Sequence, residues 1–307
     1  MAVGHELTHL DLADAARRYG APYVVIHRSD LHAILVRACG DAGVDLVTSA
    51  TVTDVAGAPE HATAIGEHRR DTGRIVLAAD GLGSTLRARL SADEPVSSAY
   101  VAYRGTVPVT DLADTSGLAL SDVVVFVGPG CHLVQYPLRR GELLNQVAVF
   151  RSPKALDGEA DWGTPDELDA AFAGTCATVR AALADLWRDR WWRMYDREPI
   201  DTWIDGRLAL TGDAAHPMLQ YLAQGACQAI EDADCLAEHL DKHPDDWDAA
   251  LAGYARTRTA RTAHVQRTAR QWGELWHGDG LFRATRNALL RDRDPHDYRH
   301  IDWLYRG

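Results

Sequence analysis

Asp213 lies where an apolar run ends in a tight turn, a position from which a carboxylate can reach a ligand. The run 208–213 is typical of a buried strand, and it delivers Asp213 to the carboxyl end, where open α/β sheets bind ligands. Gly212 permits the turn, and the small residues Gly225 and Ala226 let a ligand approach the backbone of the next helix. The N-terminus of that helix stabilises negative charge, while the carboxylate suits the hydroxyl of a sugar. A bare Gly-Asp pair is more often a plain turn, but GDAAHP in register with QGACQAIEDA favours a ligand site.

The strand-like segment 131–137, CHLVQYP, offers a second set of chemical groups. His132, Val134 and Tyr136 share one face of it because side chains alternate along a strand. A histidine with an ordinary pKa of about 6.5 can accept the proton of a phenol, and the resulting phenolate is electron-rich at its para carbon. Gln220, in the loop after the carboxylate turn, has an amide that can hydrogen-bond the same hydroxyl. From the strand pattern alone, a core histidine bonded to a neighbouring strand is the favoured interpretation of His132.

Two other groupings carry less weight. Ser84, His216 and Asp213 have the residue types of a hydrolase triad, but the chain has no GxSxG elbow. We expect His216 to be structural, with its ring bonded to backbone. Five arginines in the long helical pattern near the C-terminus are expected to form a solvated helix face or a subunit contact: Arg256, Arg258, Arg261, Arg267 and Arg270.

The elements that must position these groups begin with a helix and two strands. Residues 29–43 predict a helix capped by Ser29 or Asp30. Its expected apolar stripe consists of Leu31, Ile34, Leu35 and Ala38. A strand is expected at Val44–Ser49, and the continuous apolar run Ile75–Ala79 predicts a strand buried on both faces.

The middle of the chain changes to short β-rich runs separated by Gly and Pro. These runs predict an antiparallel sheet from Tyr100–Pro108, Asp122–Val127, Cys131–Pro137 and Gln146–Phe150. Thr164–Leu186 predicts a helix with Thr164 as cap and Pro165 at the first helical position. Further helices are expected at about 224–240, 247–276 and 281–290. The layout implies one α/β layer assembled from two separated stretches, with a β domain inserted between them.

Composition excludes several classes of protein. The chain has 307 residues and a formal net charge of −12, with no strongly basic block, which argues against nucleic acid as a partner. No apolar run is long enough for a membrane span, and no secretory signal is visible. Five scattered cysteines without a CxxC pair predict no disulfide framework, no structural zinc and a cytoplasmic location.

Three motifs occur in a meaningful order: HRSDL from His27, ADGLGSTLR from Ala79 and GDAAHPMLQYLAQGA from Gly212. In this order they resemble the class A flavoprotein aromatic hydroxylases. The resemblance implies that NADH reduces bound FAD, that the reduced FAD reacts with O₂, and that one oxygen atom enters the ring of a small aromatic substrate.

The resemblance also implies roles for residues that bind FAD. Arg28, beside a helix N-terminus, would reach the pyrophosphate or ribose side, and Val52 would offer its backbone to the adenine. Asp80 would lie near the cofactor cleft together with Arg87. Asp213 would accept from the ribityl chain, and the helix start at Gly225 and Ala226 would face the flavin.

Gln220 places the chain in one branch of this family, because many aromatic hydroxylases have Pro at the corresponding position. Members of that branch convert 3-hydroxybenzoate to gentisate, with salicylate and 6-hydroxynicotinate as alternative substrates of this chain. The resemblance assigns the catalytic contacts to His132, Tyr136 and Gln220, with the histidine deprotonating the phenol. It also suggests a homodimer.

The family's opening strand, GxGxxG and helix do not occur before Gly43. We therefore expect an α/β fold with an incomplete FAD/NAD(P)-binding Rossmann-like domain, an inserted antiparallel β-sheet substrate domain and a C-terminal helical part. The expected divisions are a partial FAD-binding domain at 1–90, the substrate-binding domain at 91–200, a second FAD-binding segment at 201–245 and a helical region at 246–307. Two hypotheses follow, a working hydroxylase and an inactive remnant with a binding role or none, and we expect weak or no retention of FAD.

Overall fold

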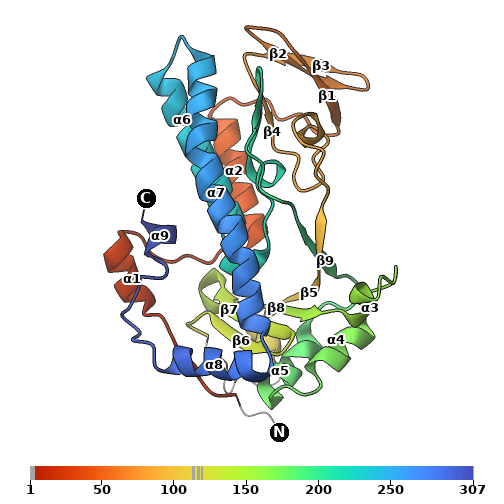
Figure 1. The fold of residues 1–307 in the computed structure, drawn as a ribbon, viewed down its shortest axis with the longest axis vertical. Helices are drawn as coiled ribbons and strands as arrows, with labels where there is room; N and C mark the ends of the chain where they lie inside the picture. The colour runs from red at the N-terminus through yellow and green to blue at the C-terminus, as the bar shows by residue number, and fades with distance from the viewer. Residues whose placement is uncertain (1–3, 113–114, 116–117, 119, 307) are drawn as a thin grey trace. The chain divides into compact units, whose positions relative to one another are not determined.

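The structure, a computed structural model, describes residues 4–112, 115, 118 and 120–306. The chain forms two compact units. The first unit comprises Met1–Asp45, Ala99–Met194 and Glu274–Gly307, and the second comprises Leu46–Ser98 and Tyr195–Gly273. Helices and sheets are mixed along the chain (Figure 1), which confirms the predicted α/β class. The four-part domain division stays a prediction. No helix in the described part of the chain is long and apolar enough to cross a membrane.

A five-stranded sheet dominates the first unit, in the order β6-β7-β8-β5-β9. Its strands are β5 (Val96–Pro108), β6 (Val124–Gly128), β7 (Cys131–Leu138), β8 (Leu143–Arg151) and β9 (Trp192–Asp196). The pairs β6/β7, β7/β8 and β5/β8 are antiparallel, as their alternating β-branched and aromatic residues predict. Val101, Tyr103, Leu133 and Phe150 are fully buried in this sheet and form its core.

The helices of the first unit are α1 (Leu12–Tyr19), α2 (Arg28–Asp41), α3 (Pro153–Leu156), α4 (Pro165–Phe172), α5 (Ala177–Ala182), α8 (Gly280–Arg291) and α9 (Asp302–Tyr305). Thr164 caps α4 as predicted, and Glu167 accepts a hydrogen bond from the Thr164 amide. The single helix predicted over Thr164–Leu186 is wrong, because α4 ends at Phe172. There the Thr175 hydroxyl donates to the Phe172 carbonyl at 2.7 Å, and Gly174 is a poor helix former.

The second unit contains two three-stranded sheets. One is the antiparallel sheet of β1 (Val52–Gly57), β2 (Ala62–Gly66) and β3 (Arg70–Gly73). The other has the order β10-β11-β4, in which β11 (Leu208–Leu210) pairs parallel with β4 (Val76–Ala78) and antiparallel with β10 (Ile204–Asp205). Helix α6 (Gly225–Lys242) and the long helix α7 (Trp247–His277) follow, as predicted, and α7 ends within the first unit.

Two predictions near the N-terminus are wrong. Residues 44–49 form no strand, and β1 begins only at Val52. The capping residue of α2 is His27, whose ring accepts from the Ser29 amide, and the expected apolar stripe is not buried, since Ile34 and Leu35 are about half exposed. An apolar pattern forms a strand or buries a helix only where another element supplies partners, and none of the described residues pairs with 44–49.

The predicted strand Ile75–Ala79 forms as β4, but it is shorter and pairs with β11 alone among the described strands. Ala78 is buried, whereas Leu77 is 43% exposed, so the expectation of a strand buried on both faces is wrong. The parallel pairing of Leu210 with Ala78 nevertheless brings the ends of β4 and β11 to the same edge. The turns that carry Asp80 and Asp213 therefore start next to each other.

Candidate functional site

The carboxylate turn of the second unit has the geometry that its sequence predicts. Gly212 has φ +56°, a left-handed conformation that glycine adopts without strain. Asp213 is exposed, and a Cβ on Gly225 would lie 3.8 Å from its Oδ1. The N-cap residue of α6, Gln224, makes no side-chain cap bond to the first turn. An exposed carboxylate and the amides of a helix start therefore share a small space without a side chain between them.

A buried aspartate on α6 holds this turn from behind. Asp232 is fully buried, and its Oδ2 accepts from the Gly212 amide at 2.9 Å, from the Thr211 hydroxyl at 3.3 Å and from His216 Nε2 at 2.6 Å. Its Oδ1 accepts from Arg258 Nε at 2.7 Å. Burial alone raises the pKa of this carboxyl, but the hydrogen bonds from His216, Arg258 and Gly212 outweigh it and leave the pKa below its ordinary value. His216 is structural, as expected, but its partner is a carboxylate and not the backbone.

Of the five α7 arginines expected on a solvated face or at a subunit contact, Arg256 and Arg267 are exposed, but Arg258 and Arg270 bind carboxylates within the second unit. Arg258 is 3% exposed and donates to Glu231 at 2.6 Å and to the Gln228 carbonyl at 3.1 Å, besides its bond to the buried aspartate. Arg270 binds the buried Asp196 carboxylate at 2.6 Å. Both side chains therefore bind carboxylates within the second unit, and the buried Arg258 cation requires such a partner.

Arg87 holds the loop after the carboxylate turn from another side. It is 1% exposed and donates to the carbonyls of Ala214 and Ala215 at 3.0 and 2.6 Å. The same guanidinium binds the Asp93 carboxylate and the Glu198 carbonyl. Arg87 therefore supports the backbone of the loop that follows the carboxylate turn.

Three other residues predicted to bind FAD are exposed: Arg28, Val52 and Asp80. Asp80 accepts from the Thr85 amide at 3.1 Å and so closes its own turn. Val52 opens β1 and lines a hollow of about 260 Å³ beside the β2–β3 turn. Arg28 is the first residue of α2 and belongs to the first unit, whereas Asp80 and Val52 belong to the second.

The β7 strand presents the predicted alternation. His132, Val134 and Tyr136 share one face, and they pair across β8 with Val149, Val147 and Asn145. His132 is 2% exposed, and Tyr136 is half-buried. Burial raises the pKa of Tyr136, against the opposing effects of Arg104 and Asn145.

Arg104 is a residue of this face that the sequence analysis missed. It pairs with Val147 of β8 and so occupies the row between those of His132 and Tyr136. Burial lowers the pKa of the Arg104 guanidinium, and the neighbouring Tyr136 opposes that effect. The face therefore carries a base, a phenol and a cation within a few strand positions.

His132 also has a partner from outside the sheet. Its Nδ1 lies 2.7 Å from Nε2 of His277, the last residue of α7, and the two rings are stacked with centroids 5.0 Å apart. The ring of Tyr100 stacks on that of His277, with centroids 4.4 Å apart. The alternative interpretation of His132, a core histidine bonded to a neighbouring strand, is therefore wrong for Nδ1, whose partner is a residue of helix α7.

Both histidines depart from the ordinary pKa that the sequence analysis assumes. Burial, and then repulsion from His277 when that ring is protonated, hold the pKa of His132 well below 6.5. Burial, and then Arg286 and Arg151, lower the pKa of His277 to about 4. Both rings are therefore neutral at pH 7. The only sequence signal for His277 is its place at the end of a long helical pattern.

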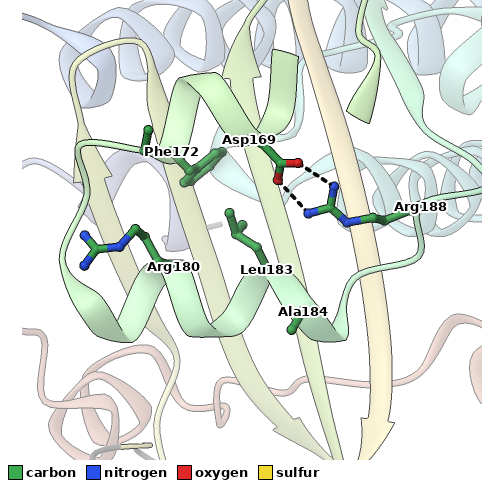
Figure 2. A pocket seen from close by; sticks show the side chains of 7 residues that line it. Asp169, Phe172, Arg180, Leu183, Ala184 and Arg188 are labelled. Carbon is green, nitrogen blue, oxygen red and sulfur yellow. Dashed lines mark hydrogen bonds and ion pairs between the residues drawn. The ribbon is translucent and has the colours of Figure 1, made fainter. Parts of the chain in front are cut away.

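A hollow of about 310 Å³ on the first unit contains none of the predicted site residues (Figure 2). Phe172, Leu183 and Ala184 line it, and Asp169 forms a two-bond ion pair with Arg188 at 2.6 and 2.9 Å. The aspartate neutralises Arg188, and Arg180, which also lines the hollow, donates to the Thr175 carbonyl. We assign the hollow no part in the chemistry.

Comparison with known proteins identifies the class. Residues 4–271 match the family model described as "FAD binding domain", and the chain belongs to that family. Within it, the chain is a flavoprotein monooxygenase of the class A aromatic hydroxylases, as its motifs predict.

The relatives carry specific names. The chain is 37% identical over 295 residues to the "3-hydroxybenzoate 6-hydroxylase" of Polaromonas naphthalenivorans (strain CJ2), covering 94% of this chain and 72% of that protein. It is 35% identical to the "3-amino-4-hydroxybenzoate 2-monooxygenase" of Streptomyces cremeus, covering 99% of this chain and 75% of that protein. The solved structure "Salicylate hydroxylase substrate complex" is 28% identical with a TM-score of 0.74, covering 92% of this chain and 73% of that one.

Proposed function

We propose that the protein hydroxylates a phenolic aromatic acid, with 3-hydroxybenzoate converted to gentisate as the favoured reaction. The observation that carries the proposal is the neutral, buried His132 on a sheet face shared with Tyr136 and Arg104. A base, a hydrogen-bonding phenol and a cation match the hydroxyl, the ring and the carboxylate of such an acid. The named relatives act on hydroxylated benzoates, which supports the same class of substrate.

The residues of the second unit fit FAD. The space between Asp213 and Gly225 is one that a Cβ would narrow, and the first-turn amides of α6 are available to an electron-rich ring edge. When bound, FAD supplies the redox chemistry, with NADH as reductant and O₂ as the source of the oxygen atom. Asp213 would accept from the ribityl hydroxyls, and Gly225 and Ala226 would donate backbone amides to the flavin.

The contacts proposed for the rest of FAD follow the motifs. Arg28 would bind the pyrophosphate, the Val52 backbone would bind adenine, and Asp80 would shape the edge of the cleft. Each of these residues is exposed in its own unit. A homodimer belongs to the same proposal.

In the proposed reaction, His132 accepts the phenol proton. Its lowered pKa keeps the ring neutral at pH 7, so it is a base before substrate arrives. The phenolate activates its para carbon, and Gln220 and Tyr136 orient the hydroxyl and the ring. Arg104 binds the carboxylate, since a guanidinium pairs with a carboxylate through two parallel hydrogen bonds. Burial of this face excludes water from the reacting carbon.

The first test separates cofactor binding from chemistry. FAD binding to this chain is measured by quenching of flavin fluorescence, and Asp213→Ala is expected to weaken it at least tenfold, while His132→Asn leaves it unchanged. NADH consumption and product formation are then followed with 3-hydroxybenzoate, salicylate, 6-hydroxynicotinate and 3-amino-4-hydroxybenzoate. His132→Asn should lower the turnover number about 100-fold. Absence of product from every acid in protein with bound FAD would contradict the proposal.

The second test concerns the carboxylate. Arg104→Met should raise the KM for 3-hydroxybenzoate about 10-fold to 100-fold, as expected for loss of a hydrogen bond between charged groups. The same variant should leave the KM for a phenol without a carboxylate within about threefold of the original value. An equal effect on both substrates would remove Arg104 from substrate recognition.

A further inference from the structure

Two adjacent tryptophans where β9 begins contact two adjacent residues of β5, its neighbour in the sheet of the first unit. The ring of Trp191 stacks on that of Tyr103, with centroids 5.9 Å apart. The guanidinium carbon of Arg104 lies over the Trp192 ring, 5.6 Å from its centroid. Because side chains alternate along a strand, the two contacts lie on opposite faces of β5. Trp192 therefore meets Arg104 on the face that also carries Tyr136.

The two contacts differ in burial. Tyr103 is fully buried and donates its hydroxyl to the Gly163 carbonyl at 2.7 Å, so the contact with Trp191 belongs to the core of the first unit. The side chain of Trp192 is 41% exposed. Burial of apolar surface in the core therefore does not account for the position of the Trp192 ring, whereas attraction to a cation does.

An indole ring is a suitable support for a cation that has to bind an anion. The face of the ring attracts a guanidinium, and the attraction is stronger where the cation has lost water. Burial lowers the pKa of Arg104, and the nearby cation of Arg28 adds to that effect against the influence of Tyr136. The indole has no acceptor oxygen, so it holds the guanidinium without neutralising its charge. A carboxylate side chain in the place of Trp192 would instead compete with an acidic ligand.

We propose that Trp192 is a positioning residue that holds the guanidinium of Arg104 in place for the carboxylate of the substrate. The inference rests on the proposed function, in which Arg104 binds that carboxylate. An arginine side chain has several rotatable bonds, and ordering them opposes binding. Where the ring already orders the guanidinium in the free protein, the acid binds with a smaller loss of entropy.

The contact itself is tested by NMR of arginine-labelled protein without substrate or cofactor. The Nε–H signal of Arg104 is the one lost in Arg104→Met. It should move in Trp192→Leu, because the magnetic effect of the ring disappears. Trp187→Leu is the matched control, since Trp187 is 40% exposed and lies 5.2 Å from the guanidinium carbon of Arg190. This control should leave the Arg104 signal in place. An unmoved Arg104 signal in Trp192→Leu overturns the proposal.

The role in binding is tested by calorimetric titration of protein with bound FAD, with benzoate and phenol as probes. Trp192→Leu should raise the Kd for benzoate about tenfold and leave that for phenol within about threefold. Trp192→Phe retains an aromatic face and should stay within about threefold for both probes, as should Trp187→Leu. In the Arg104→Met background, Trp192→Leu should cause no further loss of benzoate affinity, because the two residues act together.

Three outcomes overturn the proposal: equal weakening of both probes in Trp192→Leu, additive effects of the Arg104 and Trp192 substitutions, or no binding of benzoate by the original chain. Benzoate has no hydroxyl to activate, so its binding does not depend on turnover. A chain that binds benzoate through Arg104 and hydroxylates no phenolic acid would refute the proposed function and leave the role of Trp192 intact.

Discussion

Replacement of Asp232 by asparagine tests whether the carboxylate turn depends on a buried charge. Asparagine keeps the shape and one acceptor oxygen. If that oxygen faces Gly212 and His216, the new NH₂ group takes the place of Oδ1, which lies 2.7 Å from Arg258 Nε. Two hydrogen-bond donors would then face each other without an acceptor. A buried cation that loses one partner costs about 3–5 kcal/mol. Arg258 keeps Glu231, so we expect a loss at the lower end, about 3 kcal/mol.

The assay is amide hydrogen exchange by mass spectrometry on the peptides spanning 208–233, which report on the second unit alone. Where exchange follows the opening equilibrium, a loss of about 3 kcal/mol accelerates it by a factor of about 150. Glu238→Gln on the same helix is the control, because Glu238 is exposed and pairs only with Lys242 at 2.9 Å among the described residues. It should change exchange less than threefold. Equal exchange in the two variants would refute the idea that the buried charge holds the turn.

Three further predictions concern packing, pH and the loop support. Gly105→Ala should lower the melting temperature of the first unit, because its Cβ would lie 2.3 Å from the Asp185 carbonyl oxygen, whereas Gly40→Ala, with nothing within 4 Å, should not. His277 alone should lower the unfolding free energy by about 2 kcal/mol from pH 7 to pH 5, because its folded pKa of about 4 lies below an unfolded value of about 6.5. The lowered pKa of His132 adds to this fall, and a denaturant series should show a flatter profile in His277→Leu. Arg87→Met should cost about 3 kcal/mol and speed proteolysis of the loop after the carboxylate turn, and unchanged cleavage would show that its carbonyl contacts are dispensable.

The sequence correctly predicted those helices and strands that are determined by the pattern of their own residues. The helical patterns of 224–240 and 247–276 located α6 and α7, and the alternation of 131–137 placed His132 and Tyr136 on one face. The same signals failed for 44–49, because strand formation depends on a partner strand and not on the run itself.

Local sequence patterns did not predict the buried contacts of Arg258 and His277. Arg258 is expected on a solvated helix face or at a subunit contact, but it is buried against Asp232, which lies 26 positions away in the chain. His277 lies 145 positions from His132, and no spacing rule connects them. Burial of a charge or a ring is decided by the tertiary fold, so these contacts appear only in the structure.

Two buried side chains hold main-chain atoms of the loop 211–224: Arg87 donates to the carbonyl oxygens of Ala214 and Ala215, and Asp232 accepts from the Gly212 amide. Because these contacts are made to main-chain atoms, they fix the backbone of the loop whatever side chains it carries. Residues 218, 220 and 222 are incompletely buried and belong to the same loop. Under the proposed function, randomised side chains at these three positions should change the preferred aromatic acid while the backbone of the loop is retained.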